Sequence, residues 1–398
     1  MSAPVQGYVA PGWEAVKDAF QANLDSGADL GAGVSAFHRG ECVVDLTGGW
    51  FDIEKKSEYT SDALQLVFST TKGVTAIAIA MLVQRGLLDY GAPVAQYWPE
   101  FAQHGKQDAT VAQLLSHQCG LFTVDGKISL QEALDWNTIT SRLAATAPAW
   151  PIGTKHGYHA LTYGWLAGEL IRRVDGRGPG RFVAEEIAGP LGVEIFIGLP
   201  EQYEPRVSRL TNEPVDPNAP AVDPAIAKMI ADMMGPDSPG GRALSLNGAF
   251  GEITSTEGVF NTRAVHAAEI PAANGISNAR SLATMYAATL WPVNGVQLMN
   301  DSIRECVSTT VTPVGEADTC LIMPTTFGMG FMTHGQFSPY AGSGSYGHPG
   351  AGGSVAFAQE SRQMSFAYVM NQMAANLAAD MRAQRLMDAA AKCADAAH

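Results

Sequence analysis

A serine and a lysine stand three residues apart, in Ser69-Thr70-Thr71-Lys72, at the start of a long apolar stretch. Residues three apart on a helix lie on the same face, so this spacing brings a hydroxyl close to an amine. An amine that loses its proton in an apolar setting can activate a weak hydroxyl nucleophile. The spacing alone is weak support, because a helix-capping serine followed by a solvated lysine has the same pattern. The pair therefore suggests nucleophilic catalysis only if other parts of the chain agree.

Two further segments carry residues suited to the same chemistry. Tyr158 follows a glycine-marked turn within residues 151–164 and precedes a new apolar-periodic stretch. Near the end of the chain, His348 and Gly350 form a His-x-Gly sequence among several glycines. Glycine lets a substrate approach the backbone closely. The order along the chain is Ser-x-x-Lys, then Tyr, then His-x-Gly.

This order resembles that of the serine β-lactamases and penicillin-binding proteins, and the chain is most similar to their esterase branch, the family VIII carboxylesterases. The resemblance extends over nearly the whole chain, because further segments match in the same order. These segments are residues 114–121 (LLSHQCGL), 190–192 (PLG), 273–283 (ANGISNARSLA) and 327–331 (FGMGF). The resemblance implies an α/β (α+β) fold of the β-lactamase/transpeptidase type. In that fold an antiparallel sheet is flanked by helices and joined to a mainly helical second lobe.

The resemblance also implies a role for each motif residue. Ser69 would be the acylated nucleophile, Lys72 would hold or take its proton, and Tyr158 would move protons to the leaving group and from water. Which of Lys72 and Tyr158 is the base in acylation stays open, because two such groups titrate as a coupled pair. The oxyanion hole would consist of the backbone N–H groups of Ser69 and Ala351, each worth about 3 kcal/mol of barrier.

His348 and Gly350 would contact the substrate, His348 either as a proton relay or as a hydrogen-bond donor. Here the chain departs from the lactamase pattern, since His-Pro-Gly replaces the usual Lys-Thr-Gly. A permanent cation is thereby replaced by a group that is mostly neutral at pH 7. Position 160 holds alanine where most lactamases have an asparagine that contacts the antibiotic. A neutral ester should therefore fit better than an anionic β-lactam.

The leading hypothesis is a serine carboxylesterase that hydrolyses short-chain acyl esters through an acyl-enzyme on Ser69. One alternative is a β-lactamase, D-amino-acid peptidase or amide hydrolase of the same fold. Another is a non-catalytic scaffold, although the intact Ser69, Lys72 and Tyr158 argue against it. The nucleophile signature of α/β-hydrolases, G-x-S-x-G, does not occur in the chain.

The composition of the chain limits the kinds of partner that it could bind. The chain has 398 residues, 46% of them hydrophobic, and a formal net charge of −14, which argues against nucleic acid or an anionic membrane surface as a partner. The N-terminal residues have no signal-peptide pattern and no stretch is apolar enough to span a bilayer, so we expect a cytoplasmic protein. A homo-oligomer stays open. We expect neither cofactor nor metal, and free thiols at Cys42, Cys119, Cys306, Cys320 and Cys393.

Hydrophobic periodicity predicts the elements that position these residues. Residues 33–50 alternate around His38-Arg39-Gly40-Glu41 as a β-hairpin does. A buried helix is expected over 73–88, directly after the nucleophile. Strands are expected over 327–332, 352–359 and 364–370, and a final helix over 374–397.

These elements predict one α/β lobe from residues 1–75 and 270–398, and a mainly helical lobe from 76–269, with the site between them. Residues 200–269 form a Pro/Gly-rich excursion within the second lobe. Its apolar patch, Met229 to Met234, either walls the acyl pocket with adaptable methionines or belongs to a surface excursion with one core helix.

Overall fold

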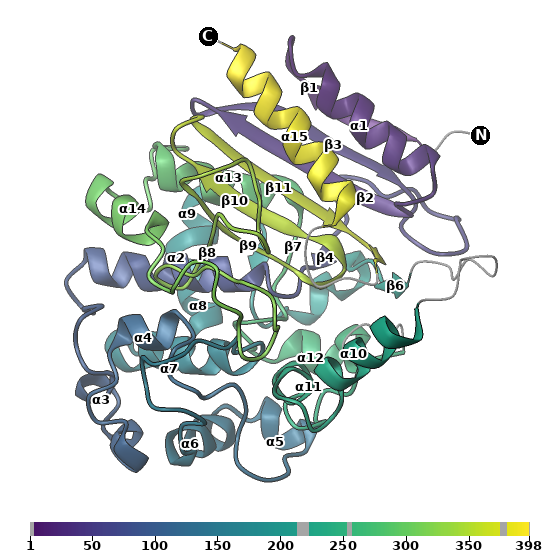
Figure 1. The fold of residues 1–398 in the computed structure, drawn as a ribbon. Helices are drawn as coiled ribbons and strands as arrows, with labels where there is room; N and C mark the ends of the chain where they lie inside the picture. Colours follow the sequence, from purple (N-terminus) through teal and green to yellow (C-terminus); the bar gives the residue numbers. More distant parts are fainter. Residues whose placement is uncertain (1–3, 213–222, 253–256, 375–379, 398) are drawn as a thin grey trace.

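The computed structural model describes residues 4–212, 223–252, 257–374 and 380–397. Its central element is a seven-stranded antiparallel sheet in the order β1-β3-β2-β11-β10-β9-β8 (Figure 1). The strands are β1 Val5–Val9, β2 Gly31–His38, β3 Glu41–Gly49, β8 Met332–Thr333, β9 Ser345–Pro349, β10 Val355–Gln359 and β11 Met364–Met370. Short strands outside this sheet are β4 Gln65–Leu66, β5 Ile195–Phe196, β6 Thr211–Asn212, β7 Ile276–Ser277 and β12 Gln372–Met373.

The two ends of the chain meet in the middle of this sheet. Strands β2 and β3 form the expected hairpin, and Arg39 and Gly40 make its turn at φ values of 49° and 85°. Such positive φ values suit the twist of a two-residue hairpin turn. Strand β2 then pairs with β11, for example Val34 with Tyr368. The predicted antiparallel sheet is confirmed, and its centre joins residues more than 300 positions apart.

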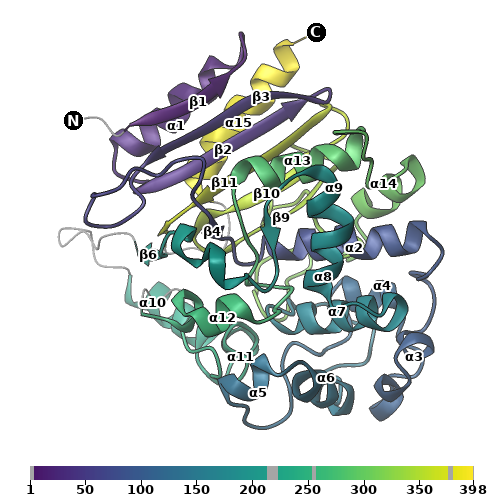
Figure 2. The same ribbon diagram turned by 180° about the vertical axis from the view of Figure 1, so that it is seen from behind.

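Helices cover both faces of the sheet. Helices α1 (Glu14–Asp25) and α15 (Met381–Ala396) lie side by side on one face (Figure 1), and α13 (Ala279–Leu290) packs on the other (Figure 2). Every residue of β11 is therefore buried. This explains why its sequence is apolar apart from Ser365, whose buried hydroxyl donates to the Ala283 carbonyl, and does not alternate with polar residues.

A helical region lies below the sheet in the view of Figure 1. Residues 90–200 contribute many of its helices. The helices of the chain not yet named are α2 Thr71–Gln84, α3 Val94–Tyr97, α4 Val111–Leu115, α5 Leu130–Leu134, α6 Trp136–Ala145, α7 Thr162–Asp175, α8 Pro179–Val183, α9 Gly189–Leu191, α10 Pro224–Met234, α11 Pro239–Ser245, α12 Arg263–Ala267 and α14 Asp301–Ser308. The expected division into two lobes stays a prediction.

Helix α2 runs between the sheet and the helical region. Its residues are buried on all sides from Thr71 to Leu82, as expected for a helix that is apolar around its whole circumference. The predicted end at Leu88 was wrong by one turn. The helix stops at Gln84, and Gly86 follows at a φ of 71°, a backbone conformation that glycine adopts easily.

Two other predicted boundaries were also wrong. Residues 327–331 form a tight turn instead of a strand, because Gly330 adopts a φ of 90° and Gly328 N–H bonds to the Phe331 carbonyl, and Met332 of the predicted range begins β8. The final helix begins at Met381, where the Asp380 side chain caps it. Residues 375–379 of the predicted helix lie outside the described residues.

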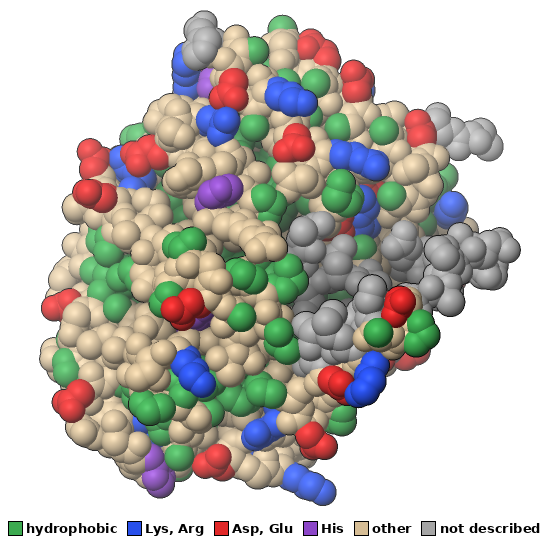
Figure 3. Space-filling model, in the orientation of Figure 1, with side chains coloured by type: hydrophobic (Ala, Val, Ile, Leu, Met, Phe, Trp, Pro, Cys, Tyr) green, Lys and Arg blue, Asp and Glu red, His purple; other side chains and the backbone are tan. Residues whose placement is uncertain are grey.

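The excursion at 200–269 contributes α10, α11 and α12. The apolar patch from Met229 to Met234 lies on α10, but the side chains of Met229, Ile230 and Met233 lie outside the described residues. No helix in the described ranges is long and apolar enough to cross a membrane. On the face shown in Figure 3, acidic and basic side chains are scattered among one another.

Asp29 is a buried carboxyl group at the edge of the sheet. Burial raises its pKa to about 6, although Arg382 and the Tyr368 hydroxyl act in the opposite direction. An unfolded chain ionises this group near its usual value of 3.8. Between pH 4 and 6 the folded state therefore holds more protons than the unfolded state, so folding loses stability as the pH rises.

We expect the Asp29→Asn variant to lose this dependence. The parent's free energy of unfolding should fall by roughly 3 kcal/mol more than the variant's between pH 4 and pH 7, since two pKa units correspond to about that energy. Urea unfolding at both pH values measures the difference. Asp108→Asn, at an exposed position, is the control and should follow the parent. Equal pH dependence in Asp29→Asn and the parent would contradict this assignment.

Candidate active site

Ser69 lies in the turn that leads into α2, two residues before its first residue. The backbone N–H of Lys72 bonds to the Ser69 carbonyl at 2.9 Å, so the chain turns tightly between the two residues. This turn carries the lysine side chain back to the serine, and Lys72 Nζ lies 3.1 Å from Ser69 Oγ. The spacing that suggested a hydroxyl–amine pair thus produces one.

Lys72 is fully buried among apolar side chains. Its Nζ donates to the backbone carbonyls of Ala160 at 2.6 Å and Ala272 at 3.0 Å. Burial without an acidic partner holds the pKa of this amine well below 10.5. A neutral amine has two N–H groups and one lone pair. The two carbonyls use both N–H groups, which leaves the lone pair for the hydroxyl proton of Ser69.

Tyr158 comes from the loop before α7 and completes the group. Its hydroxyl bonds to the Ser69 side chain, and its ring lies 4.7 Å from Lys72 Nζ. Burial raises the pKa of this phenol, which the Ser69 bond opposes and the Asp318 charge reinforces. Tyr158 is therefore a proton donor at neutral pH.

Asp318 holds the Tyr158 loop, and sequence reasoning missed it. The buried Asp318 Oδ1 accepts hydrogen bonds from the backbone N–H groups of Tyr158 and Leu321, each at 2.9 Å. One carboxylate thus fixes both the tyrosine and a wall of the cavity described below. No motif marks Asp318, because it lies 160 residues away from Tyr158 in the chain.

Histidines around Tyr158 have structural partners. His159 Nε2 accepts from the Leu121 N–H at 2.9 Å, and His117 Nδ1 accepts from the His159 N–H at 3.1 Å. Burial lowers the pKa of His159 to about 4. His156 bonds to Thr325. These contacts indicate that the three histidines hold the loop.

His348 lies on β9 with its ring stacked against Tyr158 at 5.9 Å. Its Nδ1 donates to the Pro349 carbonyl at 2.7 Å, which leaves Nε2 as an acceptor. This Nε2 is buried without a hydrogen-bond partner. Burial and the nearby Lys72 hold the pKa of His348 well below 6.5, so the ring is neutral. With Nδ1–H bound to Pro349, the ring offers a substrate an acceptor instead of the donor considered from sequence.

The loop after β9 packs against the turn that carries Ser69. A Cβ on Gly350 would lie 2.3 Å from the Val67 carbonyl, so only glycine fits there. Ser354 Oγ joins this loop to the nucleophile turn through the Val67 carbonyl at 2.9 Å and Thr70 Oγ1 at 3.2 Å. Ala351 follows Gly350 and borders the same cavity as Ser69.

A narrow cavity of about 30 Å³ opens in front of Ser69, a volume that holds roughly two waters. The predicted residues Ser69, Tyr158, His348 and Ala351 border it, while Lys72 lies behind Ser69. Its other walls are apolar and were not found from the sequence. They are Phe68, Ala160, Leu161, Leu244, Phe260, Ala273, Leu321, Phe337 and Pro349.

Two of these walls answer the question left open about residues 200–269. Leu244 from α11 and Phe260 both line the cavity, so residues 200–269 contribute to the pocket, while the role of the methionines at Met229 to Met234 stays a prediction. No group of three or more potential metal ligands occurs within the described parts of the chain.

Comparisons with known proteins agree with this site. The family model described as Beta-lactamase matches residues 16–391. "Esterase/beta-lactamase LipL" of Mycobacterium tuberculosis is 35% identical over 380 residues, 93% of this chain and 83% of that protein.

Solved structures show the same similarity. A penicillin-binding protein homolog from Caulobacter crescentus is 36% identical with a TM-score of 0.84, over 98% of this chain and 100% of that one. A family VIII carboxylesterase is 33% identical with a TM-score of 0.85, over 98% and 100% of the two chains. With the fold, the Ser69–Lys72–Tyr158 geometry and these matches together, the chain belongs to the beta-lactamase family.

Proposed function

We propose that this protein is a serine carboxylesterase that hydrolyses esters of small acyl groups through an acyl-enzyme on Ser69. The observation that carries the proposal is the contact between Ser69 Oγ and the amine of Lys72, which is buried without an acidic partner. Similar proteins named as an esterase and as a carboxylesterase support it.

In acylation, Ser69 Oγ attacks the ester carbonyl and its proton passes to Lys72 Nζ. The backbone N–H groups of Ser69 and Ala351 stabilise the oxyanion. The C–O bond to the alcohol then breaks, and Tyr158 gives its proton to the leaving oxygen. The proton held by Lys72 replaces the one that Tyr158 has lost. In this mechanism Lys72 is the base of acylation and Tyr158 the acid, in accord with their opposite pKa shifts.

In deacylation, a water molecule attacks the acyl carbon while the same pair accepts its proton. The bond from the acyl carbon to Ser69 Oγ breaks, and the serine oxygen recovers a proton from the pair. Acylation and deacylation together convert one ester and one water into a carboxylic acid and an alcohol. The small volume beside Ser69 favours short acyl chains over long ones.

The cavity favours uncharged substrates. His348 is neutral there, Lys72 is neutral behind Ser69, and neither Arg nor other Lys residues are among the lining side chains. A β-lactam carboxylate would find no cation to bind among the described side chains that line the cavity.

β-Lactam hydrolysis is the second candidate function, because one similar protein carries both activities in its name. The discriminating observation is the ratio of p-nitrophenyl acetate turnover to nitrocefin turnover, for which we expect at least about 100-fold in favour of the ester. Loss of one well-placed ionic contact alone corresponds to about this factor.

Replacing the nucleophile tests the covalent route. The Ser69→Ala variant should lose at least about 10³-fold in kcat on p-nitrophenyl acetate while its melting temperature stays near that of the parent. A fluorophosphonate should modify Ser69 of the parent and add the mass of one phosphonyl group per chain. Ester turnover retained in the variant would reject the nucleophile, and an unlabelled Ser69 with no turnover would favour a non-catalytic scaffold.

Replacing the base tests the role of Lys72. Lys72→Arg keeps N–H donors but carries a permanent charge and has no lone pair to accept a proton, so kcat/KM should fall by about 10²- to 10⁴-fold. In the parent, kcat/KM should rise with pH through a pKa well below 10.5. Lys106→Arg is a matched control, because buried Lys106 also donates to two backbone carbonyls, those of Ala144 and Thr146. Equal activity of the two variants would contradict the proposed base.

Enlarging the cavity tests acyl selection. Leu244→Ala removes part of a wall and should raise the kcat/KM ratio of butyrate to acetate ester by roughly tenfold, since each methylene is worth about 1–3 kcal/mol in a pocket. The buried Leu199 does not line the cavity, so Leu199→Ala controls for general destabilisation. A ratio that changes equally in both variants would count against a size-selective pocket.

A further inference from the structure

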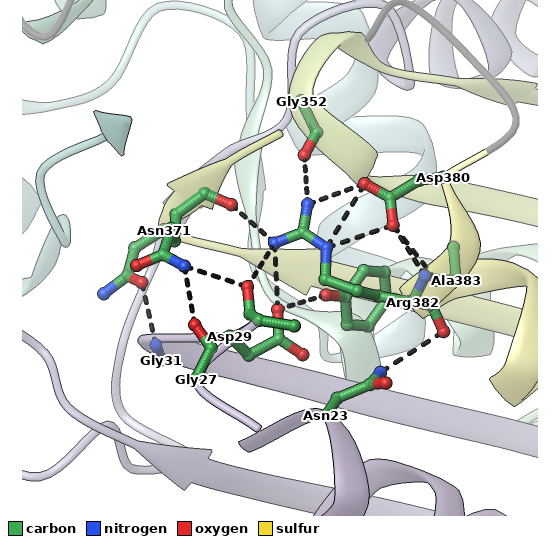
Figure 4. Close-up of polar contacts among 12 residues, drawn as sticks. Asn23, Gly27, Asp29, Gly31, Gly352, Asn371, Asp380, Arg382 and Ala383 are labelled. Atoms are coloured by element: carbon green, nitrogen blue, oxygen red, sulfur yellow. Dashed lines mark hydrogen bonds and ion pairs between the residues drawn. The ribbon is translucent and has the colours of Figure 1, made fainter. Parts of the chain in front are cut away.

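A buried ionic cluster lies directly behind the loop that carries Ala351. Arg382, at the start of α15, points into it together with Asp380, Asp29 and Tyr368 (Figure 4). The guanidinium is 6% exposed. The mechanism proposed above does not use any of these residues, although buried charges are costly to a fold.

Each part of the Arg382 guanidinium has an acceptor. Nη1 donates to Asp29 Oδ1 at 3.1 Å and to the Gln372 carbonyl at 2.8 Å. Nε and Nη2 form a two-pronged ion pair with Asp380, whose closest contact is 2.6 Å. Nη2 also donates to the Gly352 carbonyl at 2.6 Å. A planar guanidinium held at this many points has one orientation.

The Gly352 carbonyl connects the cluster to the active site, because Ala351 is its immediate neighbour. Gly352 and Gly353 adopt φ values of 81° and 128°, which side-chain-bearing residues rarely adopt. A Cβ on Gly353 would lie 2.6 Å from Arg382 Nη2 and from Asp380 Oδ2. The glycines thus let the loop lie directly on the ion pair.

Packing alone does not hold this side of the loop. A gap of about 20 Å³ lies between the loop and α15, bordered by Gly350, Gly353 and Asp380 among others. On its other side the loop is joined to the nucleophile turn by Ser354. The Gly352 carbonyl also accepts a hydrogen bond from the Ala374 N–H at 3.1 Å. The Arg382–Gly352 bond acts together with this backbone bond, and both lie on the side of the loop opposite the Ser354 contacts.

We infer that Arg382 is a positioning residue for catalysis, which holds the Gly352 carbonyl so that the Ala351 N–H is aimed at the oxyanion formed on Ser69. Asp380 orients the guanidinium for this task and also caps α15. The inference rests on the proposed function, because it assigns the Ala351 N–H to the oxyanion hole. It makes the first turn of the C-terminal helix part of the catalytic apparatus.

The test compares Arg382→Lys with Arg304→Lys. A lysine keeps the buried cation but cannot reach Asp29, Asp380 and Gly352 together. Arg304 is a matched control, since it is 7% exposed and pairs with Asp301 at 2.6 Å and Glu360 at 3.1 Å. Asp380→Asn provides a second variant that keeps the helix cap if Arg382→Lys does not fold.

Three readouts are expected to change together. In Arg382→Lys, kcat on p-nitrophenyl acetate should fall roughly 10- to 100-fold with KM changed less than about threefold, because only the transition state uses the oxyanion donor. The Ki of ethylboronic acid, which forms a tetrahedral adduct with a serine, should rise by a similar factor. Amide hydrogen exchange in a peptide covering residues 350–356 should become faster.

Arg304→Lys should leave kcat, Ki and the exchange of residues 350–356 near parent values. Unchanged exchange in both Arg382→Lys and Asp380→Asn would overturn the inference, as would a loss of kcat without a rise in the boronic acid Ki. If the Ser69→Ala variant turned over ester at the parent's rate, the proposed function would be rejected, and with it the role of the Ala351 N–H in the oxyanion hole. The exchange measurement would then still decide whether Arg382 holds the loop.

Discussion

The burial of one lysine amine without an acidic partner is the constraint on which the rest of the site depends. An ammonium in this position would cost several kcal/mol, so burial holds the pKa of Lys72 well below 10.5 and favours its neutral form. The carbonyls of Ala160 and Ala272 then define where its lone pair points. Ala160 replaces the asparagine of related lactamases, yet its backbone still holds the lysine. The apolar surroundings thus favour a neutral amine that faces the serine hydroxyl, which is the arrangement that the proposed mechanism requires of its base.

Three segments distant in the chain must meet for this chemistry. Helix α2 and the turn before it bring Lys72 and Ser69, the loop before α7 brings Tyr158, and β9 with its following loop brings His348 and Ala351. The central sheet fixes the last of these, because β9 and β10 pair with strands anchored to the N-terminal hairpin. Buried polar side chains then adjust each segment. Asp318 fixes the tyrosine loop, Ser354 joins the glycine loop to the nucleophile turn, and Arg382 holds that loop from behind.

The same arrangement explains substrate selection. A cavity lined by apolar side chains and neutral hydrogen-bonding groups provides no counter-ion for an acid, so shape and transition-state stabilisation decide which acyl groups react. The residues with net charge lie outside this space. Asp318 and the Arg382 cluster bind backbone groups of the site. They can therefore orient the site while their charges stay away from the substrate.

Much of this protein was determined by its sequence. The turn at Arg39-Gly40, the buried helix after Ser69 and the apolar strand β11 all follow from local periodicity and glycine placement, which neighbouring residues decide. The motif order identified Ser69, Lys72 and Tyr158. Tertiary structure decided the rest. Residues 327–331 turn because of long-range packing around Gly330, the cavity walls come from five or more separate segments, and Asp318 and Arg382 act on residues 160 and 30 positions away. Contacts at such separations depend on the folded path of the chain, which no local pattern encodes.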